Sequence, residues 1–202
     1  MLRLGLTGGI ASGKSAVAAM LREMGFPVLD ADSLAHKLIE PGQPAHSEIL
    51  AAFGTEVVAA GGGIDRAKLG AIVFADRQKL GLLNAIVHPR VREAIFRQFG
   101  EWQRNGNRDA VFVEAALLVE ADFTKDLDGL VVAWSTPEQQ LSRLLARGLK
   151  EPEARRRIAA QLPVGEKLRQ ATEKIDCSGS LENTRRQVEG LAAKLRCKPA
   201  PS

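Results

Sequence analysis

The chain carries, close to its first residue, the stretch Gly8-Gly9-Ile10-Ala11-Ser12-Gly13-Lys14-Ser15. This stretch fits the pattern G-x-x-x-x-G-K-[S/T] without a mismatch, and that pattern is typical of loops that bind nucleotide phosphates. Apolar residues 2–6 come before it, and an amphipathic segment follows it. Because a strand before the motif and a helix after it are the context that the motif requires, the sequence predicts a phosphate loop here.

Each residue type in the loop suits phosphate binding. The glycines allow backbone angles that a Cβ forbids, so successive N–H groups can point into one concavity at the positive end of a helix. The Lys14 ammonium can approach the β- and γ-phosphates, and the Ser15 hydroxyl can join the shell of a Mg²⁺ ion. We expect the following residues to contact ATP: Gly9, Ile10, Ala11, Ser12, Gly13, Lys14, Ser15 and Ala16.

Short apolar runs predict an α/β fold. Buried strands are expected at residues 2–6, 27–30, 110–113 and 130–134, with a weaker one at 174–177. Runs of this length suit a parallel sheet that helices cover on both faces. From Lys14 onward apolar residues recur at helical spacing, and Gly25 ends that helix. The expected architecture is therefore a P-loop NTPase fold, a parallel sheet flanked by helices.

Two long intervals between the strands predict inserted parts. Residues 33–108 exceed one crossover helix, show helical periodicity of their own and should form a helical substrate-binding insertion. Residues 138–169 are polar and rich in arginine, and we expect them to form a lid. The core then consists of residues 1–32, 109–137 and 170–202.

Basic side chains in the lid have two interpretations. Arg143 and Arg147 are four residues apart, on one helical face, and Arg155, Arg156 and Arg157 follow. They form either a solvated helical face or a set of guanidinium groups that reach the oxygens of a triphosphate.

An acidic motif, Asp30-Ala31-Asp32, follows the second expected strand. Ligands of open α/β sheets bind at this carboxyl edge, so one carboxylate could orient or deprotonate an attacking hydroxyl. The alternative is structural, with Asp32 or Ser33 as the N-cap of a helix that begins near Leu34. Glu114, at the end of the third strand, either holds metal-bound water or has a plain structural role.

Composition narrows the class of partner. The chain has 202 residues, 45% hydrophobic and 26% charged, with a formal net charge of +4. Aromatic residues make up 4% and Tyr is absent, so stacking platforms for single-stranded nucleic acid are hard to build. A small polyanionic substrate explains the excess positive charge, and we expect no nucleic acid as partner.

Targeting and metal signals are weak. No apolar run approaches the ~20 residues of a membrane-spanning helix, and the first residues do not resemble a signal peptide. Cys177 and Cys197 lack metal-ligand spacing, and the histidines are scattered. We therefore expect a reduced, cytoplasmic setting without membrane association, no protein-built metal site, and a monomer or weak homo-oligomer.

With these features placed, the chain resembles the dephospho-coenzyme A kinase family over nearly its whole length. The resemblance rests on residues 6–10 (Leu-Thr-Gly-Gly-Ile), 30–32 (Asp-Ala-Asp), 40–42 (Glu-Pro-Gly), 72–76 (Ile-Val-Phe-Ala-Asp), 83–89 (Leu-Asn-Ala-Ile-Val-His-Pro) and 117–120 (Leu-Leu-Val-Glu). It implies a P-loop core, a helical coenzyme-binding domain and a lid. It also implies transfer of the γ-phosphoryl group of ATP, with Mg²⁺, to the ribose 3′-hydroxyl of dephospho-coenzyme A.

The resemblance also implies roles for single residues. Asp32 matches the family's proposed catalytic base, and Arg143 and Arg147 match lid arginines that act with Lys14 in catalysis. His88 and Pro89 fall in the coenzyme-binding domain, where His88 either contacts substrate or serves as a helix-start or packing residue before Pro89.

The chain departs from the family pattern at four positions. Ala116 stands where the family usually has proline, Ala16 where threonine is common, and Gly148 where an acidic residue is common. Cys177 replaces an asparagine in a segment that lies near adenine in the family.

Overall fold

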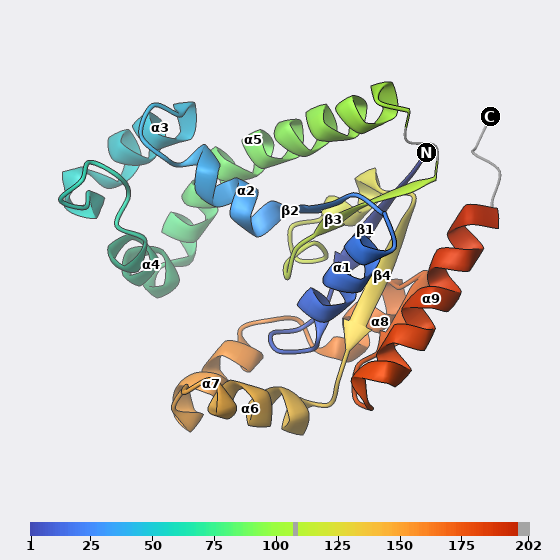
Figure 1. Cartoon of the computed structure of the whole chain (residues 1–202). Helices are drawn as coiled ribbons and strands as arrows, with labels where there is room; N and C mark the ends of the chain where they lie inside the picture. Colours follow the sequence, from blue (N-terminus) through green and yellow to red (C-terminus); the bar gives the residue numbers. More distant parts are fainter. Residues whose placement is uncertain (107–108, 198–202) are drawn as a thin grey trace. The chain divides into compact units, whose positions relative to one another are not determined.

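The computed structural model describes residues 1–106 and 109–197, and Figure 1 shows the course of the chain. Residues 107–108 and 198–202, at the ends of the predicted insertion and core, lie outside the described residues. The chain forms two compact units, one of residues 1–30 and 99–202 and the other of residues 31–98. In the part of the chain described here, no helix is both long and apolar enough to cross a membrane.

The larger unit is built on one sheet. Its strands are β1 (Leu2–Thr7), β2 (Val28–Asp30), β3 (Ala110–Glu114), β4 (Gly129–Trp134) and β5 (Glu173–Asp176). Their order is β2-β3-β1-β4-β5, and every neighbouring pair is parallel. The α/β prediction and the position of each strand are confirmed, the weakly predicted fifth strand included.

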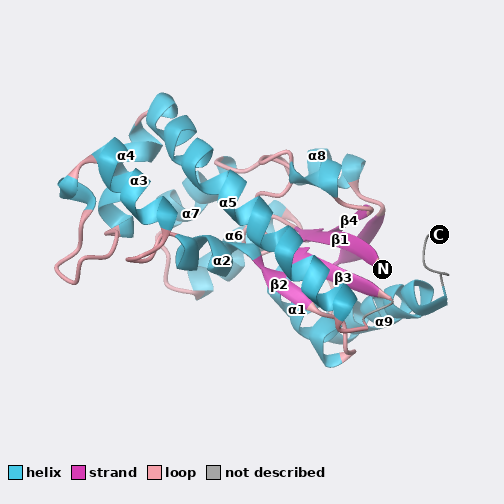
Figure 2. Cartoon of the chain, turned by 90° about the horizontal axis from the view of Figure 1, so that it is seen from above, coloured by secondary structure: helices cyan, strands magenta, loops and turns pink. Residues whose placement is uncertain are grey.

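Helices cover both faces of this sheet. The helical elements of the larger unit are α1 (Lys14–Glu23), η2 (Phe123–Asp126), α6 (Pro137–Ala146), α7 (Glu151–Ala159), α8 (Val164–Gln170) and α9 (Leu181–Cys197). Figure 2 shows the sheet between α8 on one side and α1 with α9 on the other. Lys14 begins α1 and Gly25, at a positive φ of 87°, follows its end, as predicted.

The core of the larger unit explains why these strands are apolar throughout. Alternate residues of the central strands, Leu6 and Phe112 among them, pack against the apolar faces of α1 and α9, and Leu21 and Val188 are fully buried there. Phe26 meets Phe112 edge to face, with ring centroids 5.8 Å apart. A strand buried on both faces has no solvent side for polar residues, so its sequence reads as a continuous apolar run.

The smaller unit is helical and has its own core. It contains α2 (Ala31–Leu38), α3 (Pro44–Phe53), η1 (Thr55–Val57), α4 (Arg66–Ala75) and most of α5 (Arg77–Arg104). Apolar side chains from these elements form one cluster: Ala45, Ile49, Phe53, Val57, Leu69, Val73 and Ile86. Asp65 caps α4 by accepting from the N–H groups of Ala67 and Lys68. The helical periodicity predicted for this interval is confirmed.

Two local predictions about helix starts are wrong. Helix α2 begins at Ala31, so Asp32 and Ser33 lie in its first turn and neither is the N-cap. Helix α5 begins at Arg77 and runs through Pro89, so His88 is not a helix-start residue. Pro89 removes one helical hydrogen bond. The helix continues, and next to this site the Arg90 guanidinium donates to the carbonyl of Ile86.

We expect truncation of the Phe112 side chain to destabilise the core of the larger unit strongly. Phe112→Ala removes a fully buried ring and its edge-to-face contact, so we expect a loss of about 3–5 kcal/mol in the free energy of unfolding. Urea unfolding measures the change. Leu181→Ala, at a side chain that is 65% exposed, is the control and should stay within about 0.5 kcal/mol. Equal losses in the two variants would contradict the burial argument.

Candidate active site

The predicted phosphate loop connects β1 to α1 through residues with unusual backbone angles. Gly13 has a φ of 103° and Ala11 a φ of 57°, both in the left-handed region. The Ser12 N–H donates to the carbonyl of Gly9 at 3.1 Å, which closes the turn. The N-cap of α1 is Gly13, which has no side chain to cap the first turn, and the Ala16 N–H donates to the Gly13 carbonyl at 3.0 Å. The N–H groups at a helix start have no carbonyl partner one turn earlier in the helix, so the start of α1 suits an anion.

Close packing explains why two loop positions must be glycine. A Cβ on Gly8 would lie 2.3 Å from the carbonyl oxygen of Ala133, at the end of β4. A Cβ on Gly13 would lie 2.7 Å from the Cβ of Cys177, and its φ of 103° would strain any other residue. The loop is therefore pressed against the ends of β4 and β5, and only glycine permits this approach.

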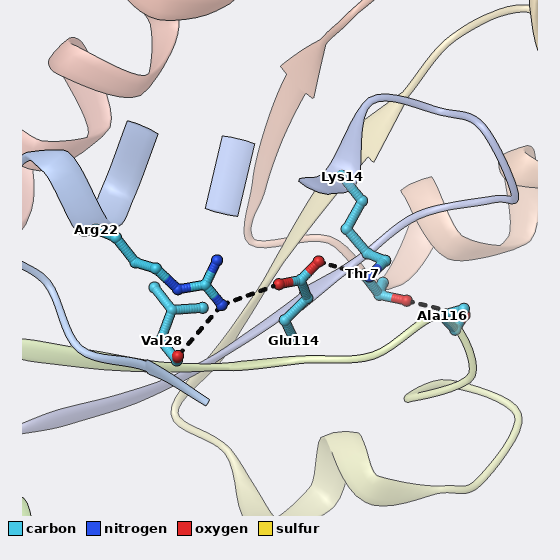
Figure 3. Close-up of polar contacts among 6 residues, drawn as sticks. All are labelled: Thr7, Lys14, Arg22, Val28, Glu114 and Ala116. Carbon is cyan, nitrogen blue, oxygen red and sulfur yellow. Dashed lines mark hydrogen bonds and ion pairs between the residues drawn. The ribbon is translucent and has the colours of Figure 1, made fainter. Parts of the chain in front are cut away.

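A buried carboxylate holds the loop lysine (Figure 3). The Lys14 ammonium donates to Glu114 Oε1 at 2.7 Å, and Arg22 approaches Glu114 Oε2 at 3.3 Å while it donates to the carbonyl of Val28. Glu114 is 5% exposed. The structure thus gives Glu114 a definite role beside the loop, as the counter-ion of two cations.

The arginines of the predicted lid separate into two groups. Arg143 donates to the carbonyl oxygens of Ala11 at 3.0 Å and of Cys177 at 2.7 Å, so it links the phosphate loop to the segment after β5. Arg155 and Arg157, on α7, instead pair with Glu151 and Glu153 one helical turn away, and both arginine side chains are more than half exposed. This pairing favours the solvated-face interpretation for that part of the lid.

A pocket of about 230 Å³ lies beside the phosphate loop. Predicted loop and lid residues line it together with the start of α9: Ala11, Gly13, Ala16, Arg143, Arg147, Cys177, Gly179, Leu181 and Thr184. Burial raises the pKa of the Cys177 thiol above its ordinary value. The pocket therefore joins a backbone anion site, two guanidinium groups and an apolar wall.

The predicted acceptor residues belong to the helical unit. Asp32 is exposed in the first turn of α2, and Pro89 is exposed within α5. His88 lies beside Pro89, and partial burial lowers the pKa of its imidazole. Lys14, Ser15 and the lid arginines belong to the sheet unit.

Sequence reasoning missed several side chains that support the loop. Gln161, between α7 and α8, accepts a hydrogen bond from the Ile10 N–H at 2.7 Å. Gln140 on α6 packs so closely over the loop that a Cβ on Gly9 would lie 2.6 Å from its amide nitrogen. Such contacts join residues more than a hundred positions apart and leave no local pattern. The start of α6 did carry a signal, because Thr136 and Gln139 form a capping box.

A five-stranded parallel sheet, a glycine-rich loop whose lysine pairs with a buried carboxylate, and an arginine of α6 that binds the loop define a kinase of the P-loop class. The model of the family described as dephospho-CoA kinase matches residues 2–183. The dephospho-CoA kinase of Geobacillus kaustophilus is 46% identical over 188 residues, which is 93% of each chain. This chain belongs to the dephospho-CoA kinase family.

Solved structures agree with this assignment. The structure of TT1252 from Thermus thermophilus has a TM-score of 0.83 and 36% identity, covering 96% of this chain and 97% of that one. The dephospho-CoA kinase of Campylobacter jejuni has a TM-score of 0.71 and 27% identity, covering 95% of this chain and 96% of that one.

Thiol labelling tests the pocket. Cys197 is exposed, whereas Cys177 is buried and has a raised thiol pKa, so less of it is thiolate at pH 8. We expect a disulfide reagent at pH 8 to label Cys197 at least ten times faster than Cys177, and Mg²⁺-ATP to slow Cys177 further. Peptide mass spectrometry measures both rates, and urea should abolish the difference. Fast labelling of Cys177 in the folded protein, unaffected by ATP, would contradict the pocket.

Proposed function

We propose that this chain transfers the γ-phosphoryl group of ATP to the ribose 3′-hydroxyl of dephospho-coenzyme A. The observation that carries the proposal is the phosphate loop with Lys14 and Arg143 at a pocket, in a chain of this family. In-line phosphoryl transfer depends mainly on positioning and electrostatic stabilisation. A preformed anion site lined by fixed cations supplies both.

The phosphate loop and the pocket beside it together suit the two ends of ATP, the triphosphate and the adenosine. We place the triphosphate against the backbone of the loop of residues 9–16, at the start of α1, and the adenosine end in the pocket beside Gly13. Arg143 lies between these two parts and already binds the loop carbonyl of Ala11. Cys177 forms a wall of the pocket, so its thiol takes the place of the family's asparagine beside the base.

The pairing of Lys14 with Glu114 suggests how the lysine acts. The ammonium has a counter-ion before the nucleotide binds, and we propose that it shifts toward the β- and γ-phosphates when they enter. Arg22 also contacts Glu114, so that carboxylate keeps one cation as a partner. Lys14 then offsets charge on the transferring group without leaving a buried charge unpaired.

The same edge of the sheet offers oxygen donors of the kind that Mg²⁺ prefers. The hydroxyl of Ser15 is exposed on the first turn of α1, and the Glu114 carboxylate could hold a metal-bound water. Bound with ATP, Mg²⁺ would neutralise part of the phosphate charge. Ser15 is the residue that we propose as its direct ligand.

We assign binding of the acceptor substrate, dephospho-coenzyme A, to residues of the helical unit. We propose that Asp32 orients or deprotonates the attacking 3′-hydroxyl, and that His88 and Pro89 contact the coenzyme. Asp32 lies two residues after the end of β2, where Asp30 is aligned with Glu114 in the sheet register. Arg143 and Arg147 would offset charge on the transferring group, and we propose a monomer or weak homo-oligomer in the cytoplasm.

Mass spectrometry of the product tests the reaction. Purified protein with Mg²⁺-ATP should add one phosphoryl group to dephospho-coenzyme A, at the 3′ position. Lys14→Met keeps the apolar stem but removes the charge, and should lower turnover by orders of magnitude while circular dichroism stays that of a folded protein. Transfer to nucleosides or nucleotides in an acceptor panel, with none to dephospho-coenzyme A, would overturn the proposal.

Asp32→Asn tests the proposed base. General-base contributions are typically ~10² to 10⁴ in rate, and because a loose transition state needs little early deprotonation we expect the lower end, with ATP binding less affected. Steady-state kinetics and a thermal melt on the same preparation measure the effect.

A matched variant separates chemistry from helix stability. Asp65→Asn changes a carboxylate at the start of another helix in the same unit, where asparagine is also a good cap. It should preserve turnover. If Asp32→Asn also keeps wild-type turnover and only shifts the melting temperature, Asp32 contributes to the stability of the fold and not to the chemical step.

A further inference from the structure

A fully buried lysine lies outside the proposed chemistry. Lys167, on α8, has no exposed side-chain surface, and its ammonium donates to the carbonyl of Ala116 at 2.6 Å and to Glu120 at 2.8 Å. Lysine is almost never fully buried unless it is paired, because its charge must be taken out of water. Because burying this charge costs free energy, we infer that the position of the Lys167 side chain matters for the geometry of the surrounding chain.

Both groups that accept hydrogen bonds from Lys167 lie in the segment that follows β3. The carbonyl of Ala116 also accepts from the Thr7 hydroxyl at 3.2 Å, at the start of the phosphate loop (Figure 3). Glu114, the partner of Lys14, is two residues before Ala116. Lys167 therefore fixes the part of the chain that carries the counter-ion of the loop lysine.

The chain just before α8 makes two further contacts with the same region. Gln161 accepts from the Ile10 N–H in the loop, and the Leu162 N–H donates to Glu120 at 3.2 Å. Glu120 thus bonds both Leu162 and Lys167. Residues 161–167, which we call the lid root, are attached on one side to the loop and on the other to the segment after β3.

We propose that Lys167 is a positioning residue that, paired with Glu120, holds the lid root and the phosphate loop in one arrangement. It touches no substrate and acts through Ala116 and Glu114 on Lys14. Without the pair, the segment after β3 loses two of its attachments, and the loop and its lysine are free to shift. The kinetic part of this proposal rests on the proposed phosphoryl transfer, whereas the structural part does not.

A charge-neutral double variant tests the proposal without leaving a buried charge behind. Glu120→Gln with Lys167→Met retains side-chain volume, and replacing both members of a buried ion pair is often neutral for stability. We expect kcat to fall at least tenfold, with the KM for ATP changed less than threefold. Without any substrate, amide hydrogen exchange in a peptide covering residues 8–13 should become at least tenfold faster.

The matched control is a lysine–glutamate pair on the surface of the same unit. Lys194, which is 63% exposed, pairs with Glu173 at 3.1 Å. Glu173→Gln with Lys194→Met should keep both kcat and loop exchange within twofold of wild type.

The outcomes separate the two proposals. Faster loop exchange in the Lys167 pair variant supports positioning even if the wild-type chain proves inactive on dephospho-coenzyme A. A lowered melting temperature, with kcat and loop exchange unchanged at 15 °C, would show a purely structural pair and overturn the inference. Equal effects in the control pair would overturn it as well.

Discussion

The buried carboxylate of Glu114 joins three parts of the fold at one point. It ends β3, binds Lys14 from the phosphate loop, and meets Arg22 from α1, which also holds the carbonyl of Val28 in β2. Breaking a buried ion pair by removing one partner typically costs about 3–5 kcal/mol, since the remaining charge stays out of water. The carboxyl edge of the sheet therefore depends on this charge balance.

The strand order explains why the site forms at that edge. Because all strands run parallel, the carboxyl ends of β1, β3 and β4 lie together, and the loops that leave them can share one site. The loop after β1 is pressed against the end of β4 at Ala133 and against Cys177 after β5. The resulting close contact leaves room for glycine only, which links the motif to the packing of the sheet.

The basic side chains between residues 138 and 169 lie in different environments. Arg143 is turned toward the phosphate loop, Arg155 and Arg157 are balanced within α7, and Lys167 is buried against the segment after β3. Residues of one charge within a single stretch thus differ in what they bind. The border between the two compact units falls within the Asp-Ala-Asp motif: Asp30 ends β2, and Asp32 lies in the first turn of α2.

The sequence alone determined the α/β class, the strands, the phosphate loop and the family, because these depend on local patterns: apolar runs, glycine positions and the lysine at the start of α1. It did not determine the start of α2 or the passage of α5 through Pro89, because local helix signals are weak and tertiary context routinely overrides them. Only the tertiary structure decided that Glu114 pairs with Lys14, that Gln161 binds the loop, and that Lys167 is buried. These contacts join residues 51 to 151 positions apart. Partners so distant share no periodicity along the chain, and for this physical reason the sequence alone could not predict them.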